Sequence, residues 1–461
     1  MSGRRVARLR PWASVLGRFH PARTIALSFG ALIALGTAVL ALPVSSEDGT
    51  GTSLVTALFT ATSAVCVTGL AVVDTPGHWS TFGEVAILAL IQVGGFGIMT
   101  LASLLAQLVA GKLRLRLTLN TQAETKSLGI GDLRRTLARI AVVTVAVEAV
   151  TALVLTVRYM TAYGDSLATA TYHGVFHAVS AFNNAGFSLN SDSLVGYAGD
   201  PWILLPICAA VILGGLGFPV IVEALRHRAV QRTTGRRGWS LHLRLTLLAT
   251  VVLLVVGTLA VAVLEWRNPA TLGAMPTDEK LMNAFVQSTM SRTAGFNAVD
   301  IGALGQATLL VTCVLMFIGG GSAGTAGGIK VTTFAVLAAA IWAEVRGERA
   351  AVIFQRTLSA AVIRQALTVA LLGVGLVVSA TTALLVMADE AFEAVMFEVV
   401  SAFGTVGLST GLTTDLPPGG DLVLIGLMFV GRLGPITLAS ALALRERPQR
   451  YQYPQERPII G

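Results

Sequence analysis

Long apolar runs dominate this chain, and polar segments separate them. A transmembrane helix needs about 20 apolar residues at about 1.5 Å each. Stretches of this kind occur at about 24–44, 83–110, 138–162, 202–225, 244–266, 306–343, 361–387 and 421–444. Glycines interrupt the sixth stretch. The pattern predicts an all-α polytopic membrane protein with eight transmembrane helices.

Shorter apolar segments lie between paired stretches, and four of them share one pattern. Each reads phenylalanine, three residues, serine or threonine, five residues, glycine, and then leucine or phenylalanine. The segments are FTATSAVCVTGL (59–70), FHAVSAFNNAGF (176–187), FVQSTMSRTAGF (285–296) and FEVVSAFGTVGL (397–408). Their glycines, spaced by 117, 109 and 112 residues, are Gly69, Gly186, Gly295 and Gly407. Four copies at a near-constant period indicate an internal repeat.

The repeat predicts a pore. A unit of span, short segment and span crosses the bilayer twice, so all four copies share one orientation and are related by an axis along the membrane normal. We expect the short segments to enter the membrane as helices and to return extended. Such backbone is tolerated at membrane depth only where it contacts protein or a water-filled path. The expected fold is therefore four pseudo-repeats of helix, pore loop and helix around one central ion pore. The short helices should begin at about Leu54, Tyr172, Lys280 and Ala391.

The return strands carry the predicted ion-binding residues. Glycine permits a positive φ at the turn, and the short helices direct their partially negative C-termini at the pore, which favours a cation. Potassium-channel filters replace the ion's water shell with backbone carbonyls, and Thr405-Val406-Gly407 matches the start of such a filter. The strands begin at Cys66, Asn183, Arg292 and Gly404. The predicted selectivity filter, with K⁺ as its only metal, comprises Val67, Thr68, Gly69, Asn184, Ala185, Gly186, Thr293, Ala294, Gly295, Thr405, Val406 and Gly407.

Several polar side chains on these strands leave alternatives open. Asn183 and Asn184 can line the path or make local turn hydrogen bonds. Arg292 should point away from the path, because a cation facing the filter would oppose a permeating cation. Its partner can be a carboxylate such as Glu398 or backbone carbonyls.

Glycine clusters follow each repeat glycine after 24 to 28 residues. They are Gly94-Gly95-Phe96-Gly97, Gly214-Gly215-Leu216-Gly217, Gly319-Gly320-Gly321 and Gly431-Arg432-Leu433-Gly434. Small residues of this kind allow close helix packing in membranes. The third cluster opens GGGSAGTAGGIK (319–330), where each glycine costs about 1 kcal/mol in a helix relative to alanine. We therefore expect the sixth span to break there.

Composition supports a bilayer protein without catalytic machinery. The chain has 461 residues, 54% of them hydrophobic and only 13% charged, against about a quarter charged in soluble domains. No nucleophile elbow, phosphate loop or dinucleotide motif occurs, and the six histidines have no ligand spacing. We predict that the protein is not an enzyme and has no covalent cofactor. The three cysteines, in apolar stretches that suggest neither disulfides nor a metal site, are Cys66, Cys208 and Cys313.

Charge predicts the topology. Of the 33 Lys and Arg residues, 27 lie in alternate connecting segments and at the two ends of the chain. The positive-inside rule places both termini and the basic loops in the cytoplasm. The basic balance is explained by this topology and by contact with anionic lipid, and it does not imply nucleic acid. The first apolar run is too long for an ordinary signal peptide, so we expect a retained helix.

The four repeat segments, GGGSAGTAGGIK and GRLGPITLAS (431–440) resemble the membrane subunits of the Trk/Ktr/HKT potassium-uptake superfamily, most closely the bacterial Ktr type. The likeness covers about residues 20–461. It implies potassium uptake across the bacterial cell membrane through a selective, gated pore. In plant relatives a serine at the first filter glycine accompanies sodium preference, so Gly69 implies potassium. Sodium remains open as an activator or co-ion, and the alternative is a sodium-coupled or sodium-permeable transporter of the same fold.

The resemblance also divides the chain and assigns a gate. In the family the glycine-rich segment is an intramembrane loop that blocks the pore and moves to open it. The implied units are a basic N-terminus (1–23), repeats at 24–116, 117–237, 238–345 and 346–446, and a tail (447–461). The expected gate comprises Gly319, Gly320, Gly321, Ser322, Gly324, Thr325, Gly327, Gly328, Lys330 and Arg432.

Lys330 and Arg432 are charges within apolar stretches. A positive charge about 8 Å from a potassium ion, at an effective dielectric constant of ~20, opposes the ion by roughly 2 kcal/mol. The two residues therefore suggest an electrostatic barrier on the cytoplasmic side. Alternatively, both are packing elements bound to carbonyls.

Two partners follow from the resemblance alone. The tail YQYPQERPIIG (451–461) is similar to Ktr endings, which reach the partner subunit of a homodimer. The family also binds a cytoplasmic ring of nucleotide-binding (RCK- or KtrA-type) regulatory subunits, so a nucleotide would act through that partner. A secondary transporter of another solute and a membrane enzyme are the competing functions. Four same-sense repeats argue against the first, and the missing acid-base cluster argues against the second.

Overall fold

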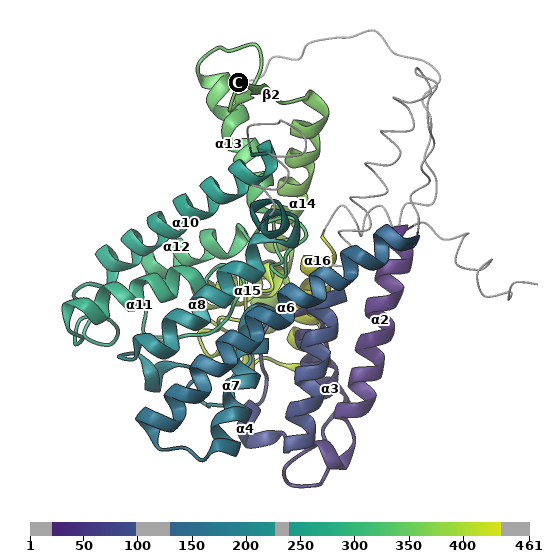
Figure 1. Cartoon of the computed structure of the whole chain (residues 1–461), viewed down its shortest axis with the longest axis vertical. Helices are drawn as coiled ribbons and strands as arrows, with labels where there is room; N and C mark the ends of the chain where they lie inside the picture. The colour runs from purple at the N-terminus through teal and green to yellow at the C-terminus, as the bar shows by residue number, and fades with distance from the viewer. Residues whose placement is uncertain (1–20, 98–129, 226–238, 435–461) are drawn as a thin grey trace, which may run out of the picture.

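The computed structural model describes residues 21–97, 130–225 and 239–434, which are mostly helical (Figure 1). Three of the described helices are long and apolar enough to cross a membrane, and these spans are Leu137–Tyr163, Leu241–Glu265 and Ala360–Met387. The first comprises most of α6 (Ile130–Arg158) and a π-helical turn, and the others are α10 and α14. This confirms a helical membrane protein with little strand.

Four short, largely buried helices lie between the longer ones. They are α3 (Leu54–Cys66), α7 (Leu167–Phe182), α11 (Thr277–Met290) and α15 (Phe392–Gly404). Helix α7 begins five residues before the predicted Tyr172, because the Ser166 hydroxyl accepts from the Thr169 amide and caps the helix there. Ser53 caps α3 in the same way. Each short helix ends where a repeat strand begins.

The described parts of the remaining apolar helices do not meet the same criterion of length and hydropathy by themselves. They are α2 (Pro21–Leu40), a helix over Thr81–Gly97, α8 (Pro201–Leu216), α12 (Gln306–Phe317), α13 (Val331–Val345) and α16 (Pro418–Leu433). As predicted, the sixth apolar stretch breaks between α12 and α13. Residues 98–110 and 435–444 of two other predicted spans lie outside the described residues.

The fourth predicted span contains a sharp bend. Helix α8 ends at Leu216, and Phe218–Leu225 continues at an angle of 98°. Gly217 makes this bend with a φ of +91°, a conformation that favours glycine. A Cβ atom on Gly217 would overlap the carbonyl oxygen of Ser322. The bend therefore exists where the glycine-rich segment packs against α8.

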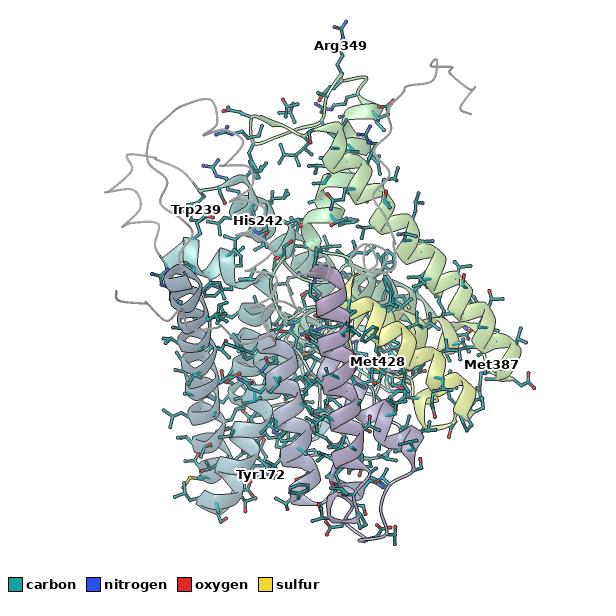
Figure 2. The ribbon with its side chains drawn as sticks, turned by 90° about the vertical axis from the view of Figure 1, so that its right-hand side faces the viewer. Tyr172, Trp239, His242, Arg349, Met387 and Met428 are labelled. Atoms are coloured by element: carbon teal, nitrogen blue, oxygen red, sulfur yellow. The ribbon has the colours of Figure 1, made fainter. Side chains whose placement is uncertain are left out.

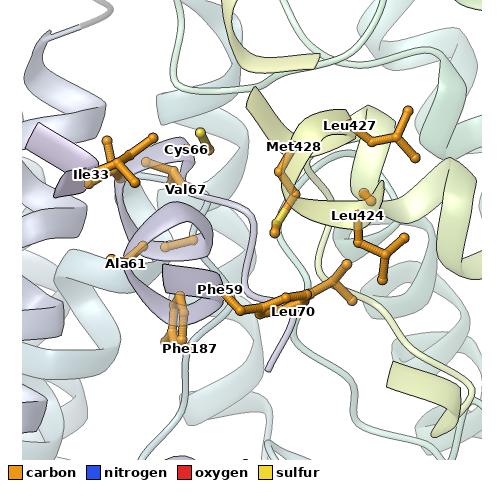
Figure 3. Packing of buried hydrophobic residues seen from close by; sticks show 14 of the residues in the cluster. Ile33, Phe59, Ala61, Cys66, Val67, Leu70, Phe187, Leu424, Leu427 and Met428 are labelled. Atoms are coloured by element: carbon orange, nitrogen blue, oxygen red, sulfur yellow. The ribbon is translucent and has the colours of Figure 1, made fainter. Parts of the chain in front are cut away.

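Each short helix packs on the helix before it, as α2–α3, α6–α7, α10–α11 and α14–α15. Contacts also run onward, because α8 packs on α11, α12 on α15, and α16 on α3. The last contact joins the end of the described chain to its beginning. Figure 3 shows this junction, where Met428 and Leu424 of α16 lie near Phe59 and Leu70.

One end of the molecule is formed by α13, α14 and a small hairpin (Figure 1). Its strands, β1 (Val352–Ile353) and β2 (Arg356–Thr357), are antiparallel. Figure 2 places Arg349 at this end, with Tyr172 toward the opposite one. The connecting segment 346–364, expected on the cytoplasmic side, thus projects beyond the apolar helices.

Candidate functional site

The four repeat strands adopt one unusual backbone conformation. Their glycines all have positive φ, at +93°, +75°, +73° and +95° for Gly69, Gly186, Gly295 and Gly407. The residue two positions earlier is also left-handed in every strand, although it is never glycine. These residues are Val67, Asn184, Thr293 and Thr405, with φ from 48° to 71°. Such values are uncommon outside glycine, so four equivalent occurrences mark a shared, constrained geometry. The sequence pattern indicated the glycines and missed the second position.

The strands meet in a closed ring. A Cβ atom built on each repeat glycine would lie closer than 3.0 Å to a carbonyl oxygen of the next strand. That oxygen belongs to the residue immediately before the next glycine. The pairs are Gly69 with Ala185, Gly186 with Ala294, Gly295 with Val406, and Gly407 with Thr68. Because the fourth strand returns to the first, the carbonyls surround one centre.

All four ring glycines also line one cavity of about 560 Å³. The loops that follow the strands complete its walls, including 71–75 and 409–414. Asp74 and Asp300 contribute carboxylates, and no Lys or Arg is among the described residues of the lining. The cavity is thus an acidic vestibule on one side of the ring, suited to a cation.

The shared spacing between the serine and the glycine of the repeat has a physical explanation. The Ser63 hydroxyl accepts from the Gly69 amide at 3.0 Å, and Ser401 accepts from Gly407 at 3.1 Å. Ser180 instead donates to the carbonyl of Phe187 at 2.8 Å. These hydroxyls hold three strands against their own short helices. Thr289, in the third repeat, bonds within its helix to Phe285.

The glycine clusters have two roles. In three of them the first glycine abuts a carbonyl in the last turn of a short helix, so closely that a Cβ atom would overlap it. The pairs are Gly94 with Val65, Gly214 with Phe182, and Gly431 with Phe403. Close packing through small residues thus explains these three clusters.

The third cluster forms a closed loop between α12 and α13. The Gly319 amide donates to Ile329 at 2.9 Å, and the Val331 amide donates to Gly320 at 2.9 Å. The Gly321 amide reaches Gly215 of α8 at 2.7 Å. We call residues 318–330 the glycine-rich loop. These bonds, from the two ends of the loop and from α8, take the place of helical hydrogen bonds at this depth.

This loop touches the ring strands. A Cβ atom on Gly327 would overlap the hydroxyl of Thr405, and the Thr325 hydroxyl lies 2.8 Å from the Asn184 carboxamide. Thr325 also donates its amide to Gly214 at 3.2 Å. The predicted gate and filter residues are therefore neighbours. Asn184 points to the loop, so its role extends beyond local turn bonding.

Both predicted gate cations bind carbonyls of the glycine-rich loop. Lys330 Nζ donates to Ala326 at 2.6 Å, and Arg432 Nη1 donates to Thr325. Arg432 is 3% exposed. Among the described residues the ion pairs are Arg158–Asp200 and Arg346–Glu348, so neither cation is neutralised by a carboxylate. Binding to carbonyls was one of the two alternatives considered for these residues.

Arg292 and Glu398 do not pair. Arg292 Nη1 donates to the carbonyl of Thr250 at 3.1 Å, which is the second partner considered for it. Glu398 instead accepts from Ser409 at 2.5 Å, the Thr410 amide at 3.0 Å and Thr413 at 2.7 Å. Glu398 thus fixes the loop after the fourth strand.

His177 occupies the equivalent position in the second repeat, one residue after the repeat phenylalanine. Its Nε2 lies 3.1 Å from the hydroxyl of Ser188, just as Glu398 contacts Ser409. Each serine follows its ring glycine by two residues. The sequence analysis missed these two contacts between the short helices and the loops after the strands. A signal was present, because a polar residue follows the repeat phenylalanine in both copies.

Comparison with known proteins gives consistent matches. A family model described as TrkH, cation transport protein, matches residues 21–451. The Ktr system potassium uptake protein B of Bacillus subtilis is 38% identical, over 96% of this chain and 97% of the relative. Its namesake from Vibrio alginolyticus is 40% identical, over 95% and 94%. The potassium/sodium uptake protein NtpJ of Enterococcus hirae is 36% identical, over 96% and 98%.

A solved structure has the same fold. The potassium transporter TrkH from Vibrio parahaemolyticus matches with a TM-score of 0.72. The match covers 96% of this chain and 87% of the other, at 18% sequence identity.

Proposed function

Because this chain belongs to the TrkH family of cation transport proteins, we propose that it is the ion-translocating subunit of a Ktr-type potassium uptake system. The observation that carries the proposal is the closed ring, in which each glycine abuts a carbonyl of the next strand. A dehydrated cation needs oxygen ligands on all sides, and four converging strands of backbone can supply them.

The ring is the proposed selectivity filter. Potassium, the substrate, would leave most of its water in the acidic vestibule and pass between carbonyls of the four strands. Glycine is needed because any side chain would occupy the space of a neighbouring carbonyl oxygen. The side chains differ among the strands, but the ion would meet mainly backbone.

The proposed architecture is four units of helix, short helix and helix around this pore, with eight spans in total. Packing of each short helix on its preceding helix supports it, as does the junction of α16 with α3. The basic segment at the Arg349 end supports the proposal that this end lies on the cytoplasmic side of a bacterial cell membrane. The vestibule would then face outward, and both termini inward.

The glycine-rich loop is the proposed gate. It contacts the ring strands through Gly327 and Thr325, on the side of the strands where α8 ends. Lys330 and Arg432 hold it by its carbonyls and place unpaired positive charge there. Opening would require these bonds to break and the charges to move away from the ion path.

Sodium has a specific place in this proposal. One relative is named for potassium and sodium uptake, so sodium is a reasonable activator or co-ion. Potassium remains the proposed main substrate, because two relatives are named for potassium uptake alone and the ring has glycine at all four positions.

We propose two protein partners. A second copy of the chain would form a homodimer, and a cytoplasmic nucleotide-binding ring would regulate the loop. The projecting segment 346–364 supports the second proposal, since Arg346, Arg349 and Arg356 give it positive charge where a soluble partner could bind.

Flux into liposomes that contain only the purified protein tests the function. Potassium and then sodium serve as the sole permeant cation, and empty liposomes are the control. We expect potassium flux well above sodium flux. Flux of neither ion, from folded protein, even after addition of a regulatory ring with nucleotide, would contradict the proposal.

A further inference from the structure

A buried polar triad lies behind the second ring strand, and the proposed function does not use it. Asn183 Nδ2 donates to Gln92 Oε1 at 2.7 Å and to Glu148 Oε1 at 3.2 Å. Gln92 Nε2 donates to Glu148 Oε2 at 3.2 Å. Asn183 directly follows α7, Gln92 lies on the Thr81–Gly97 helix, and Glu148 lies on α6. They therefore join the start of the second ring strand to two helices, α6 and the Thr81–Gly97 helix.

Glu148 has the contacts of an ionised carboxylate. Each of its two oxygens accepts an amide N–H, and neither faces an acceptor that would need a carboxyl proton. The residue is 8% exposed. No Lys or Arg forms an ion pair with it among the described residues. An unpaired acid in a transmembrane helix is expensive and is expected to have a function.

The triad acts on the ring through Asn183. This residue begins the second strand, directly before Asn184 with its left-handed backbone. Its carboxamide is held tightly, because a Cβ atom on Gly95 would overlap Oδ1. Glu148 and Gln92 therefore fix the base of the strand from behind.

The equivalent position of the third strand carries the opposite charge. Arg292 aligns with Asn183 in the repeat, and within the described part of the chain its guanidinium donates only to the carbonyl of Thr250. The Nε atom of Arg292 is buried without a partner. A positive charge behind one strand opposes a cation in the ring, whereas a negative charge behind the neighbouring strand favours it.

We propose that Glu148 is a positioning and charge-balancing residue of the selectivity filter. It orients the second strand through Asn183, and its negative charge offsets that of Arg292 for a cation in the ring. This inference rests on the proposed function of the ring as a potassium filter. The effect is reciprocal, since a cation in the ring stabilises the same carboxylate.

The chain offers a matched control in Glu84. This second buried carboxylate lies on the same helix as Gln92 and accepts from the Tyr172 hydroxyl of α7 at 2.5 Å. Glu84 thus joins the Thr81–Gly97 helix to α7 without contacting a ring strand. Glu84→Gln should reproduce any general effect of removing a buried acid at this helix pair.

The experiment compares wild type, Glu148→Gln and Glu84→Gln in liposomes. It measures the potassium dependence of flux and the potassium-to-sodium flux ratio. We expect Glu148→Gln to raise the KM for potassium about tenfold, equivalent to about 1.4 kcal/mol. The flux ratio should fall, while Glu84→Gln stays within about twofold of wild type. A Glu148→Gln protein that matches Glu84→Gln in both KM and flux ratio would overturn the inference.

Asn183→Ala carries the test if Glu148→Gln does not fold. It keeps the carboxylate but removes the link to the strand, so the potassium-to-sodium flux ratio should fall in protein that a thermal melt in potassium-free buffer shows to be folded. An unchanged ratio would contradict the positioning role. The wild-type flux distinguishes failure of this inference from failure of the proposed filter. If the wild type conducts potassium and the variants behave like the wild type, only the role of Glu148 is overturned. If the wild type conducts no potassium, the proposed filter is overturned as well.

Discussion

Arg432 Nη1 donates to the backbone carbonyl of Thr325 and so joins α16 to the middle of the glycine-rich loop. The two residues are 107 positions apart in the chain. Thr325 in turn lies against Asn184 of the second ring strand. One contact thereby connects the last described helix, the proposed gate and the proposed filter.

Arg432→Ala should increase potassium flux in the absence of any regulator. The substitution removes a loop anchor and a buried positive charge. At about 8 Å from the ion path, that charge opposes a potassium ion by roughly 2 kcal/mol, so its removal should raise the flux by up to about 30-fold. Flux into liposomes measures it. Arg346→Ala, at an exposed ion pair of 4.0 Å, is the control. A folded Arg432→Ala protein with wild-type flux would contradict the gate assignment.

Gly69→Ser should allow more sodium through relative to potassium. The glycine has a φ of +93°, and the new Cβ would displace the carbonyl of Ala185 in the next strand. A distorted ring should discriminate less between the ions. The ratio of sodium to potassium flux is the measurement, with Gly30→Ser as control because no atom lies within 4 Å of a Cβ there. An unchanged ratio would argue against Gly69 as part of the filter.

Ser401→Ala should loosen the fourth strand without unfolding the protein. Its hydroxyl accepts from the Gly407 amide at 3.1 Å, a bond worth about 1 kcal/mol, or about fivefold. We expect a potassium-to-sodium flux ratio that is lower by up to this factor. Ser379→Ala removes an exposed bond within α14 and should leave the ratio unchanged. Equal ratios in the two variants would show that the tether is dispensable.

Gly431→Ala should lower the thermal stability of the purified protein. A Cβ atom at this position would overlap the carbonyl of Phe403, and overpacking of this kind typically destabilises by about 1–3 kcal/mol. Gly426→Ala, on the same helix with nothing within 4 Å, should be neutral or slightly stabilising. Melting temperatures in detergent give the comparison. Equal melting temperatures would mean that α16 shifts freely on α15.

The sequence alone predicted the features that depend on local chemistry. Helical membrane character follows from apolar runs, and the break after Phe317 follows from glycine's poor helix propensity. The repeat glycines were identified by their spacing, because each combines a positive φ with a neighbouring carbonyl oxygen that leaves no room for a Cβ atom. The family resemblance could be read from the same segments, and the comparisons confirmed it.

Only the tertiary structure decided which distant groups meet. Gly217 bends the chain where the glycine-rich loop packs, and Arg292 binds the Thr250 carbonyl, whereas Glu398 binds the loop after its own strand. The order of the ring and the triad around Glu148 depend on how helices pack across the bilayer. Backbone preference is a property of a few neighbouring residues, whereas the partner of a buried polar group depends on which helices lie beside it.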